Sequence, residues 1–209
     1  MPALSPPPRW GDRRRARIGL LGGSFNPAHA GHRHLAEIAL RRLRLHAVWL
    51  LVSPGNPLKP TAGMAPLATR LASARTLCDG KRLFASAIES RLGTRYTADT
   101  LAALRKRFPL ARFVWLMGAD NLAQLPRWRN WRKLVKLMPF AVVPRAPSTY
   151  RALAGAAARR LRRARLPARA ACVLAEAEAP AWAFLPASRH AASATAIRTA
   201  CRRASTRPN

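Results

Sequence analysis

Acidic residues are scarce in this chain of 209 residues, which has 8 Asp and Glu against 38 Lys and Arg. The resulting formal net charge of +30 attracts polyanions, among them nucleic acids and nucleotides. The excess of arginine comes with abundant alanine and proline, which is typical of a compositional bias across a whole sequence. Because no RNA- or DNA-binding module pattern accompanies the charge, nucleic acid is not expected as a specific partner.

Cysteines and long apolar runs are few as well. Cys78, Cys172 and Cys201 lie far apart and form no C-x-x-C pair, which argues against a disulfide framework and a zinc knuckle. No apolar run approaches the roughly 20 residues that a membrane helix needs. Residues 1–17 lack the apolar middle of a secretory signal. We therefore expect a cytoplasmic protein without membrane contact.

The 49% of hydrophobic residues is enough for one good core. Residues 1–15 are proline- and arginine-rich and are expected to form a disordered basic arm before a single domain over 16–209. Apolar runs that alternate with helical patterns predict an α/β fold, a Rossmann-like doubly wound parallel sheet with a small C-terminal helical part. The first strand, helix and second strand should form a right-handed βαβ unit.

The expected elements follow from hydrophobic periodicity and from turn residues. Strands are predicted from about residue 17 and at 47–52, 83–88, 112–117, 140–143 and 182–185. Helices are predicted at 31–45, from 66 to about 78, at 98–108 with Thr97 as N-cap, from about 128 to 137, at 148–166, and from Ser193 or Thr195 to 203. The segment from 53 to 60, with three prolines and a glycine, is predicted to be a loop at the carboxyl end of a strand.

The chemistry is expected where the first strand meets the first helix, at residues 22–32. The turn reads Gly22-Gly23-Ser24-Phe25-Asn26-Pro27-Ala28-His29-Ala30-Gly31-His32. Paired glycines let backbone approach a ligand, and a helix N-terminus offers N–H groups and partial positive charge. Zinc is disfavoured because His29, His32 and His34 lack the i, i+4 spacing that a helical zinc pair uses. The turn therefore predicts a nucleotide-handling site.

Four segments in register extend this prediction. The arrangement His29-x-Gly31-His32 resembles that of the nucleotidylyltransferase superfamily. The turn at 22–32, the segments 96–101, 118–122 with Trp128, and 193–198 follow the order seen in bacterial nicotinate-nucleotide adenylyltransferases. The resemblance implies adenylyl transfer from ATP to nicotinate mononucleotide, giving deamido-NAD and pyrophosphate. It also implies Mg²⁺ carried by the ATP phosphates, without a metal site in the protein.

The resemblance implies roles for particular residues. Those implied in catalysis are His29, His32 and Arg198. Those implied in ATP binding are Gly22, Gly23, Ser24, Phe25, Gly31, Asp120, Ser193, Thr195 and Ile197. Those implied in binding the mononucleotide are Asn56, Lys59, Tyr96, Thr97, Trp128 and Arg129. For Trp128 a plain core position is nearly as well supported, because Trp131 lies close to it in sequence.

Two alternatives remain open at this point. A sister transferase acting on nicotinamide mononucleotide, phosphopantetheine or glycerol phosphate would share His29, His32 and much of the ATP site. A basic RNA-binding protein on the same fold belongs to a different class. The arginine-rich segment at 148–169 matches neither reading and is interpreted as a solvated helical face.

Overall fold

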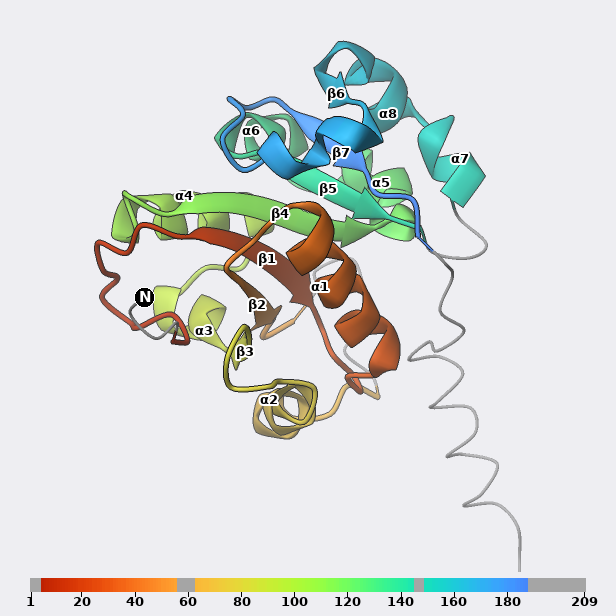
Figure 1. Ribbon diagram of the computed structural model, residues 1–209. Helices are drawn as coiled ribbons and strands as arrows, with labels where there is room; N and C mark the ends of the chain where they lie inside the picture. Colours follow the sequence, from red (N-terminus) through yellow and green to blue (C-terminus); the bar gives the residue numbers. More distant parts are fainter. Residues whose placement is uncertain (1–4, 56–62, 145–148, 188–209) are drawn as a thin grey trace, which may run out of the picture.

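The structure is a computed structural model that describes residues 5–55, 63–144 and 149–187 (Figure 1). Within these ranges all strands join one parallel sheet in the order β3-β2-β1-β4-β5-β7-β6. The strands are β1 (Arg17–Gly23), β2 (Ala47–Val52), β3 (Leu83–Ser86), β4 (Arg112–Gly118), β5 (Phe140–Val143), β6 (Arg165–Leu166) and β7 (Trp182–Phe184). The predicted Rossmann-like parallel sheet is therefore confirmed.

Helices cover both faces of this sheet. The α-helices are α1 (Ala30–Arg42), α2 (Leu67–Arg75), α3 (Ile88–Leu92), α4 (Thr97–Arg107), α5 (Ala119–Gln124), α6 (Trp131–Leu137), α7 (Thr149–Leu153) and α8 (Ala156–Arg160). Three short 3₁₀ segments are η1 (Leu125–Arg127), η2 (Arg162–Ala164) and η3 (Ala168–Val173). Helices α4 and α6 pack on one face, and α1 and α2 pack on the other.

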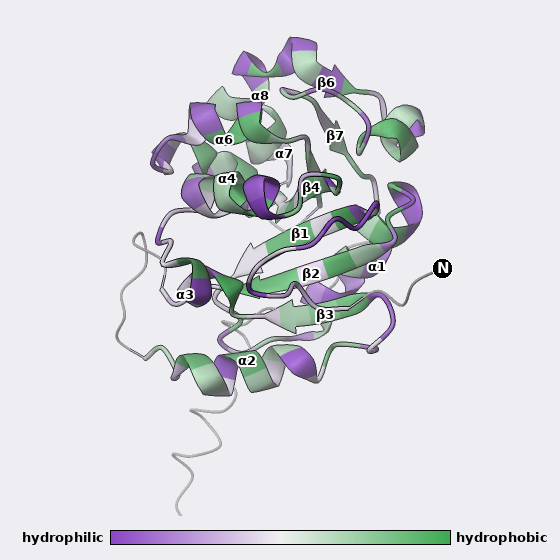
Figure 2. Ribbon diagram, turned by 90° about the vertical axis from the view of Figure 1, so that its left-hand side faces the viewer, coloured by the Kyte–Doolittle hydropathy of each residue, from purple (hydrophilic) through white to green (hydrophobic). Residues whose placement is uncertain are grey.

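Strand β2 shows why the sequence folds in this way. All six of its residues are buried, and they belong alternately to the two core clusters on either side of the sheet. Trp49 and Leu51 pack on the α4 side, whereas Leu50 and Val52 pack on the α1 side. A continuous apolar run is what a parallel strand covered on both faces requires. Figure 2 shows largely hydrophobic strands surrounded by helices that carry the hydrophilic residues.

Several predicted boundaries are corrected. The helix expected at 148–166 is broken into α7, α8, η2 and strand β6, because Gly155 before α8 and Arg165 after η2 both have extended backbone. Helix α1 ends at Arg42 rather than 45, since Arg44 adopts a left-handed φ of 49°. Thr97 is the first residue of α4, and Tyr96 occupies the N-cap position. The helix after residue 66 ends at Arg75, and β3 ends at Ser86 before α3.

Residues 5–15 also differ from the expected loose arm. Pro7 is buried, and the Arg14 guanidinium lies 5.3 Å from the ring centroid of Trp49 and 5.7 Å from that of Phe108. At Gly11, with φ of 85°, a Cβ atom would lie 2.0 Å from the Arg107 carbonyl oxygen. This segment packs on the core through a proline, a close backbone approach and cation–π contacts, which its low apolar content does not reveal.

Candidate active site

The candidate site lies at the carboxyl ends of β1 and β4. Strand β1 pairs with β2 on one side and with β4 on the other, so the order of connections reverses between β1 and β4. Ligands of open α/β sheets bind in the crevice at such a switch point. A pocket of about 360 Å³ occurs here.

This pocket brings together most of the predicted residues that the structure describes. Those lining it are Gly22, Gly23, Ser24, Phe25, His32, Tyr96, Thr97, Asp120, Trp128 and Arg129. Gly31 and buried His29 lie at the start of α1, next to the lining residue His32. The other predicted residues lie outside the described ranges: Asn56, Lys59, Ser193, Thr195, Ile197 and Arg198.

The two histidines cap helix α1. Nδ1 of His29 accepts a hydrogen bond from the backbone N–H of Gly31 at 3.1 Å. Nδ1 of His32 accepts one from the backbone N–H of His29 at 3.2 Å. A neutral imidazole that accepts at Nδ1 carries its proton at Nε2. The capping arrangement thus assigns both rings the tautomer whose Nε2–H can donate to an anion.

Ring packing fixes the same pair. The centroids of His29 and His32 are 3.9 Å apart, and Phe25 lies 4.7 Å from His32. His29 is 5% exposed and Phe25 is 1% exposed, so the rings of these two residues have little room to rotate. The first turn of α1 contains no acidic residue, which leaves the positive end of the helix dipole available to an anion.

The paired glycines serve packing as well as backbone access. A Cβ atom at Gly22 would lie 2.3 Å from Cη2 of Trp115, and one at Gly23 would lie 3.3 Å from Cε2 of Phe25. Trp115 also lines the pocket. Gly22 is therefore required where the indole of β4 crosses the end of β1.

Asn26 joins the turn to the segment before α2. Its Nδ2 donates to the Gly63 carbonyl at 3.1 Å, and its Oδ1 accepts from the Ala65 N–H at 3.2 Å. The side-chain amide donates and accepts at once, whereas an ionised aspartate has acceptors alone. Asparagine at this position thus holds two loops at the pocket rim together.

A second wall of the pocket comes from the start of α4 and the end of η1. The Arg129 guanidinium lies 4.6 Å from the ring centroid of Tyr96, which connects the two elements. Trp128 and Trp131 are both half-buried against the core, but only Trp128 lines the pocket. Trp128 therefore faces the pocket and also packs against the core.

Sequence reasoning missed three residues of this site. Trp115 lines the pocket, Arg70 lies beneath it, and Glu89 is a lining carboxyl that is only 8% exposed. Burial raises the pKa of Glu89 to about 7, while a hydrogen bond from Thr100 acts in the opposite direction. The scarcity of acidic residues was a signal that could have singled out Glu89.

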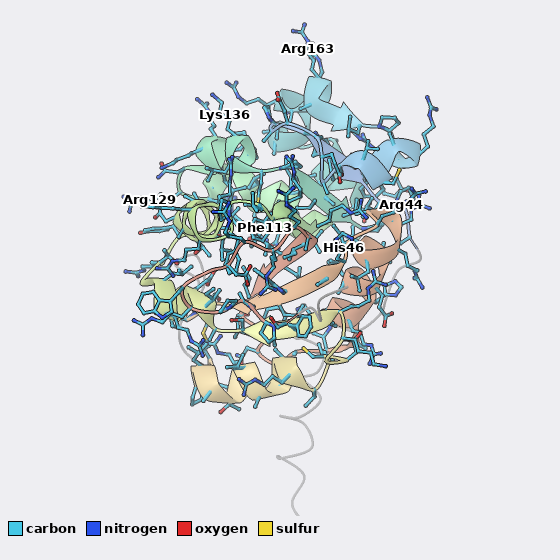
Figure 3. The ribbon with its side chains drawn as sticks, turned by 60° about the vertical axis from the view of Figure 1, so that its left-hand side comes forward. Arg44, His46, Phe113, Arg129, Lys136 and Arg163 are labelled. Atoms are coloured by element: carbon cyan, nitrogen blue, oxygen red, sulfur yellow. The ribbon has the colours of Figure 1, made fainter. Side chains whose placement is uncertain are left out.

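A larger cavity of about 1000 Å³ lies at the opposite edge, where the strands begin. Arg17, His46, Phe113 and Lys136 are among its lining residues. Figure 3 shows His46, Phe113 and Lys136, together with Arg163 extending away from the protein. Of the predicted site residues within the described ranges, none lines this cavity.

Comparisons with known proteins show the family of the chain. Residues 20–200 match the family described as Cytidylyltransferase-like. A "Probable nicotinate-nucleotide adenylyltransferase" of Gluconacetobacter diazotrophicus is 60% identical over 194 residues, covering 93% of this chain and 90% of the relative. A relative of the same name from Gluconobacter oxydans is 60% identical over 182 residues, covering 87% and 93%.

Solved structures show the same fold. The Plasmodium falciparum nicotinic acid mononucleotide adenylyltransferase complexed with NaAD has a TM-score of 0.64 at 16% identity, covering 88% of this chain and 83% of its own. No helix among residues 5–55, 63–144 and 149–187 is long and apolar enough to cross a membrane. The chain belongs to the cytidylyltransferase-like family and, within it, to the nicotinate-nucleotide adenylyltransferases.

Proposed function

We propose that the chain transfers the adenylyl group of ATP to nicotinate mononucleotide, forming deamido-NAD and pyrophosphate. The observation that carries this proposal is the His29–His32 pair, which backbone N–H groups hold in the Nε2–H tautomer at the start of α1. The family of the chain and the pocket at the strand switch point support the same reaction.

The reaction needs alignment and charge stabilisation more than proton transfer. An oxygen of the 5′-phosphate of nicotinate mononucleotide attacks the α-phosphorus of ATP, and the bond to the β-phosphate oxygen breaks. Because this nucleophile is already an anion, no general base is required. Negative charge spreads over the phosphates as pyrophosphate leaves, and Nε2–H groups of His29 and His32 would donate to them there.

The mononucleotide end of the pocket is assigned to the second wall. We expect Trp128 to stack on the pyridine ring, with backbone near Tyr96, Thr97 and Arg129 meeting the carboxylate. The Arg129–Tyr96 contact supports this arrangement, since it holds both contributing segments in place. Asp120, at the start of α5, would accept a hydrogen bond from a ribose hydroxyl.

Other roles rest on the resemblance alone. We propose that the outer phosphates of ATP are held by Ser193, Thr195 and Arg198, and that Ile197 also belongs to the ATP site. The mononucleotide would contact Asn56 and Lys59. We propose that Mg²⁺ arrives on the ATP phosphates and takes few ligands from the protein. Bound in this way, Mg²⁺ would neutralise phosphate charge.

A pyrophosphate-release assay with ATP and several candidate acceptors tests the proposal. We expect the fastest turnover with nicotinate mononucleotide and slower or no turnover with nicotinamide mononucleotide, phosphopantetheine and glycerol phosphate. Equal or faster turnover of the amide would instead favour the sister transferase. RNA binding that survives physiological salt, with no pyrophosphate release, would favour the RNA-binding alternative.

A further inference from the structure

A buried arginine lies directly behind the proposed phosphate site. Arg70 of α2 is 2% exposed, and no carboxylate in the described part of the chain forms an ion pair with it. Its guanidinium donates to four backbone carbonyls, those of Ser24 at 2.8 Å, Ser53 at 2.7 Å, Pro54 at 3.1 Å and Ala65 at 2.8 Å. Three of these carbonyls belong to the loops that leave β1 and β2.

These hydrogen bonds orient the peptides on the pocket side. In a planar trans peptide the C=O and N–H groups point in opposite directions. Because the carbonyls of Ser24 and Pro54 face Arg70, the N–H groups of Phe25 and Gly55 face away from it. Phe25 and Gly55 both line the pocket. Within the ranges that the structure describes, neither N–H has a hydrogen-bond acceptor.

The backbone at Phe25 needs such support. Its φ of 48° lies in the left-handed region, which costs a non-glycine residue on the order of 1 kcal/mol or more. Successive N–H groups around a residue in this conformation form a concavity that suits an anion. Arg70 from one side and the packing of Phe25 against His32 from the other hold this conformation.

We propose that Arg70 is a positioning residue that aims the amide N–H groups of Phe25 and Gly55 at the phosphates of the substrates. The proposal rests on the proposed function for the identity of the anion. The guanidinium also polarises the two peptides through their carbonyls, which strengthens N–H donation on the opposite side. Its positive charge adds favourable potential behind the phosphates without touching them.

The test compares Arg70→Met, Arg70→Lys and the control Arg75→Met, which replaces an exposed arginine at the end of the same helix. Affinity for inorganic pyrophosphate is measured by calorimetry, and the amide resonances of Phe25 and Gly55 are followed by NMR during the titration. We expect pyrophosphate to shift both resonances in the wild type. In Arg70→Met the affinity should fall by about tenfold or more and the shifts should shrink, because each aligned N–H contributes strongly to binding an oxyanion.

The lysine variant separates positioning from folding. Lys retains the charge but has three donors instead of five, so Arg70→Lys should bind pyrophosphate with intermediate affinity. This variant carries the test if Arg70→Met folds poorly. Wild-type affinity and wild-type shifts of the two resonances in folded Arg70→Lys and Arg70→Met would overturn the proposal. Absence of pyrophosphate release by the wild type would contradict the proposed function alone, because the binding comparison does not depend on turnover.

Discussion

The backbone N–H of His29 donates to Nδ1 of His32 over 3.2 Å, so the N-cap residue of α1 sets the tautomer of the histidine three residues further along the chain. His29 in turn accepts from the N–H of Gly31 at 3.1 Å. Each imidazole thereby has a capping nitrogen and a second nitrogen that carries the proton. In each ring, Nδ1 caps the helix and Nε2–H is the group that can donate to a ligand.

Asparagine variants separate these two roles. The Oδ1 atom of Asn can replace Nδ1 of histidine as the capping acceptor, but Asn has no group that reaches the position of Nε2. We expect His29→Asn and His32→Asn to keep wild-type thermal stability within a few tenths of a kcal/mol and to lower kcat by on the order of 10² or more. Steady-state pyrophosphate release and thermal unfolding measure the two effects.

Alanine variants provide the matched comparison. His29→Ala and His32→Ala should lose the same turnover and, in addition, the cap, with a stability loss of about 1 kcal/mol each. Unchanged turnover in all four variants would contradict the roles proposed for these histidines.

The second prediction concerns the contact between Gly22 and Trp115. Gly22→Ala places a methyl group 2.3 Å from the present position of Cη2 of the indole. We expect a loss of about 1–3 kcal/mol in the free energy of unfolding, because a packed ring cannot move without cost. Combining it with Trp115→Phe removes the clashing atom and should recover part of that loss.

A double-mutant cycle by urea denaturation measures this coupling. The Nε1 atom of Trp115 has no hydrogen-bond partner among the described residues, so Trp115→Phe breaks no such bond there. Additive effects of the two substitutions would show that the indole does not explain the need for Gly22.

The sequence was most informative where one physical requirement governs a whole segment. The run Ala47–Val52 predicts a strand buried on both faces, and all of its residues are buried. The turn at 22–32 predicts a ligand site because glycines, histidines and a helix start coincide there. Both predictions depend only on neighbouring residues in the chain, so local patterns are enough to make them.

Features that depend on distant residues could not be predicted in the same way. In the sequence, Arg70 is simply a charged residue within a predicted helix. Its hydrogen-bond partners are 5 to 46 residues away along the chain and come together only in the folded protein. The burial of Glu89 depends likewise on how α3 packs beside α4. The prediction of one helix at 148–166 was wrong because it gave more weight to the alanine-rich composition than to Gly155, where the helix is interrupted.

The third prediction follows from the buried carboxyl of Glu89. Its pKa rises from 4.5 to about 7 on folding. Between these pH values the folded chain binds more protons than the unfolded chain, so its stability falls as pH rises through that window. Glu89→Gln removes the titration and should stabilise the protein at pH 8 by on the order of 2 kcal/mol, with little gain at pH 4.

Urea denaturation of wild type and Glu89→Gln at pH 4, 6 and 8 measures this difference. Glu178→Gln, at an exposed carboxyl, is the control for removing a negative charge. A stability difference between Glu89→Gln and wild type that stays constant with pH would contradict a carboxyl that is neutral in the folded state.

The last prediction concerns His46 at the opposite edge of the sheet. Its Nδ1 accepts a hydrogen bond from the Arg17 N–H at 2.8 Å. Burial lowers the pKa of His46, and the nearby charges of Arg17 and Arg82 lower it further, while Glu176 acts in the opposite direction. The stabilisation from this lowered pKa is present above about pH 6.5, the value of unfolded histidine, and is lost as pH falls through the folded pKa.

We therefore expect wild-type stability to fall relative to His46→Asn as the pH drops from 7 to 5, because Asn keeps an acceptor for the Arg17 N–H but does not titrate. NMR titration should place the pKa of His46 below that of a histidine in an unstructured peptide. Arg82→Gln removes one of the charges that lower the pKa and should raise it. If the free energies of unfolding of wild type and His46→Asn changed in parallel between pH 7 and 5, protonation of His46 would not destabilise the folded protein, contrary to this prediction.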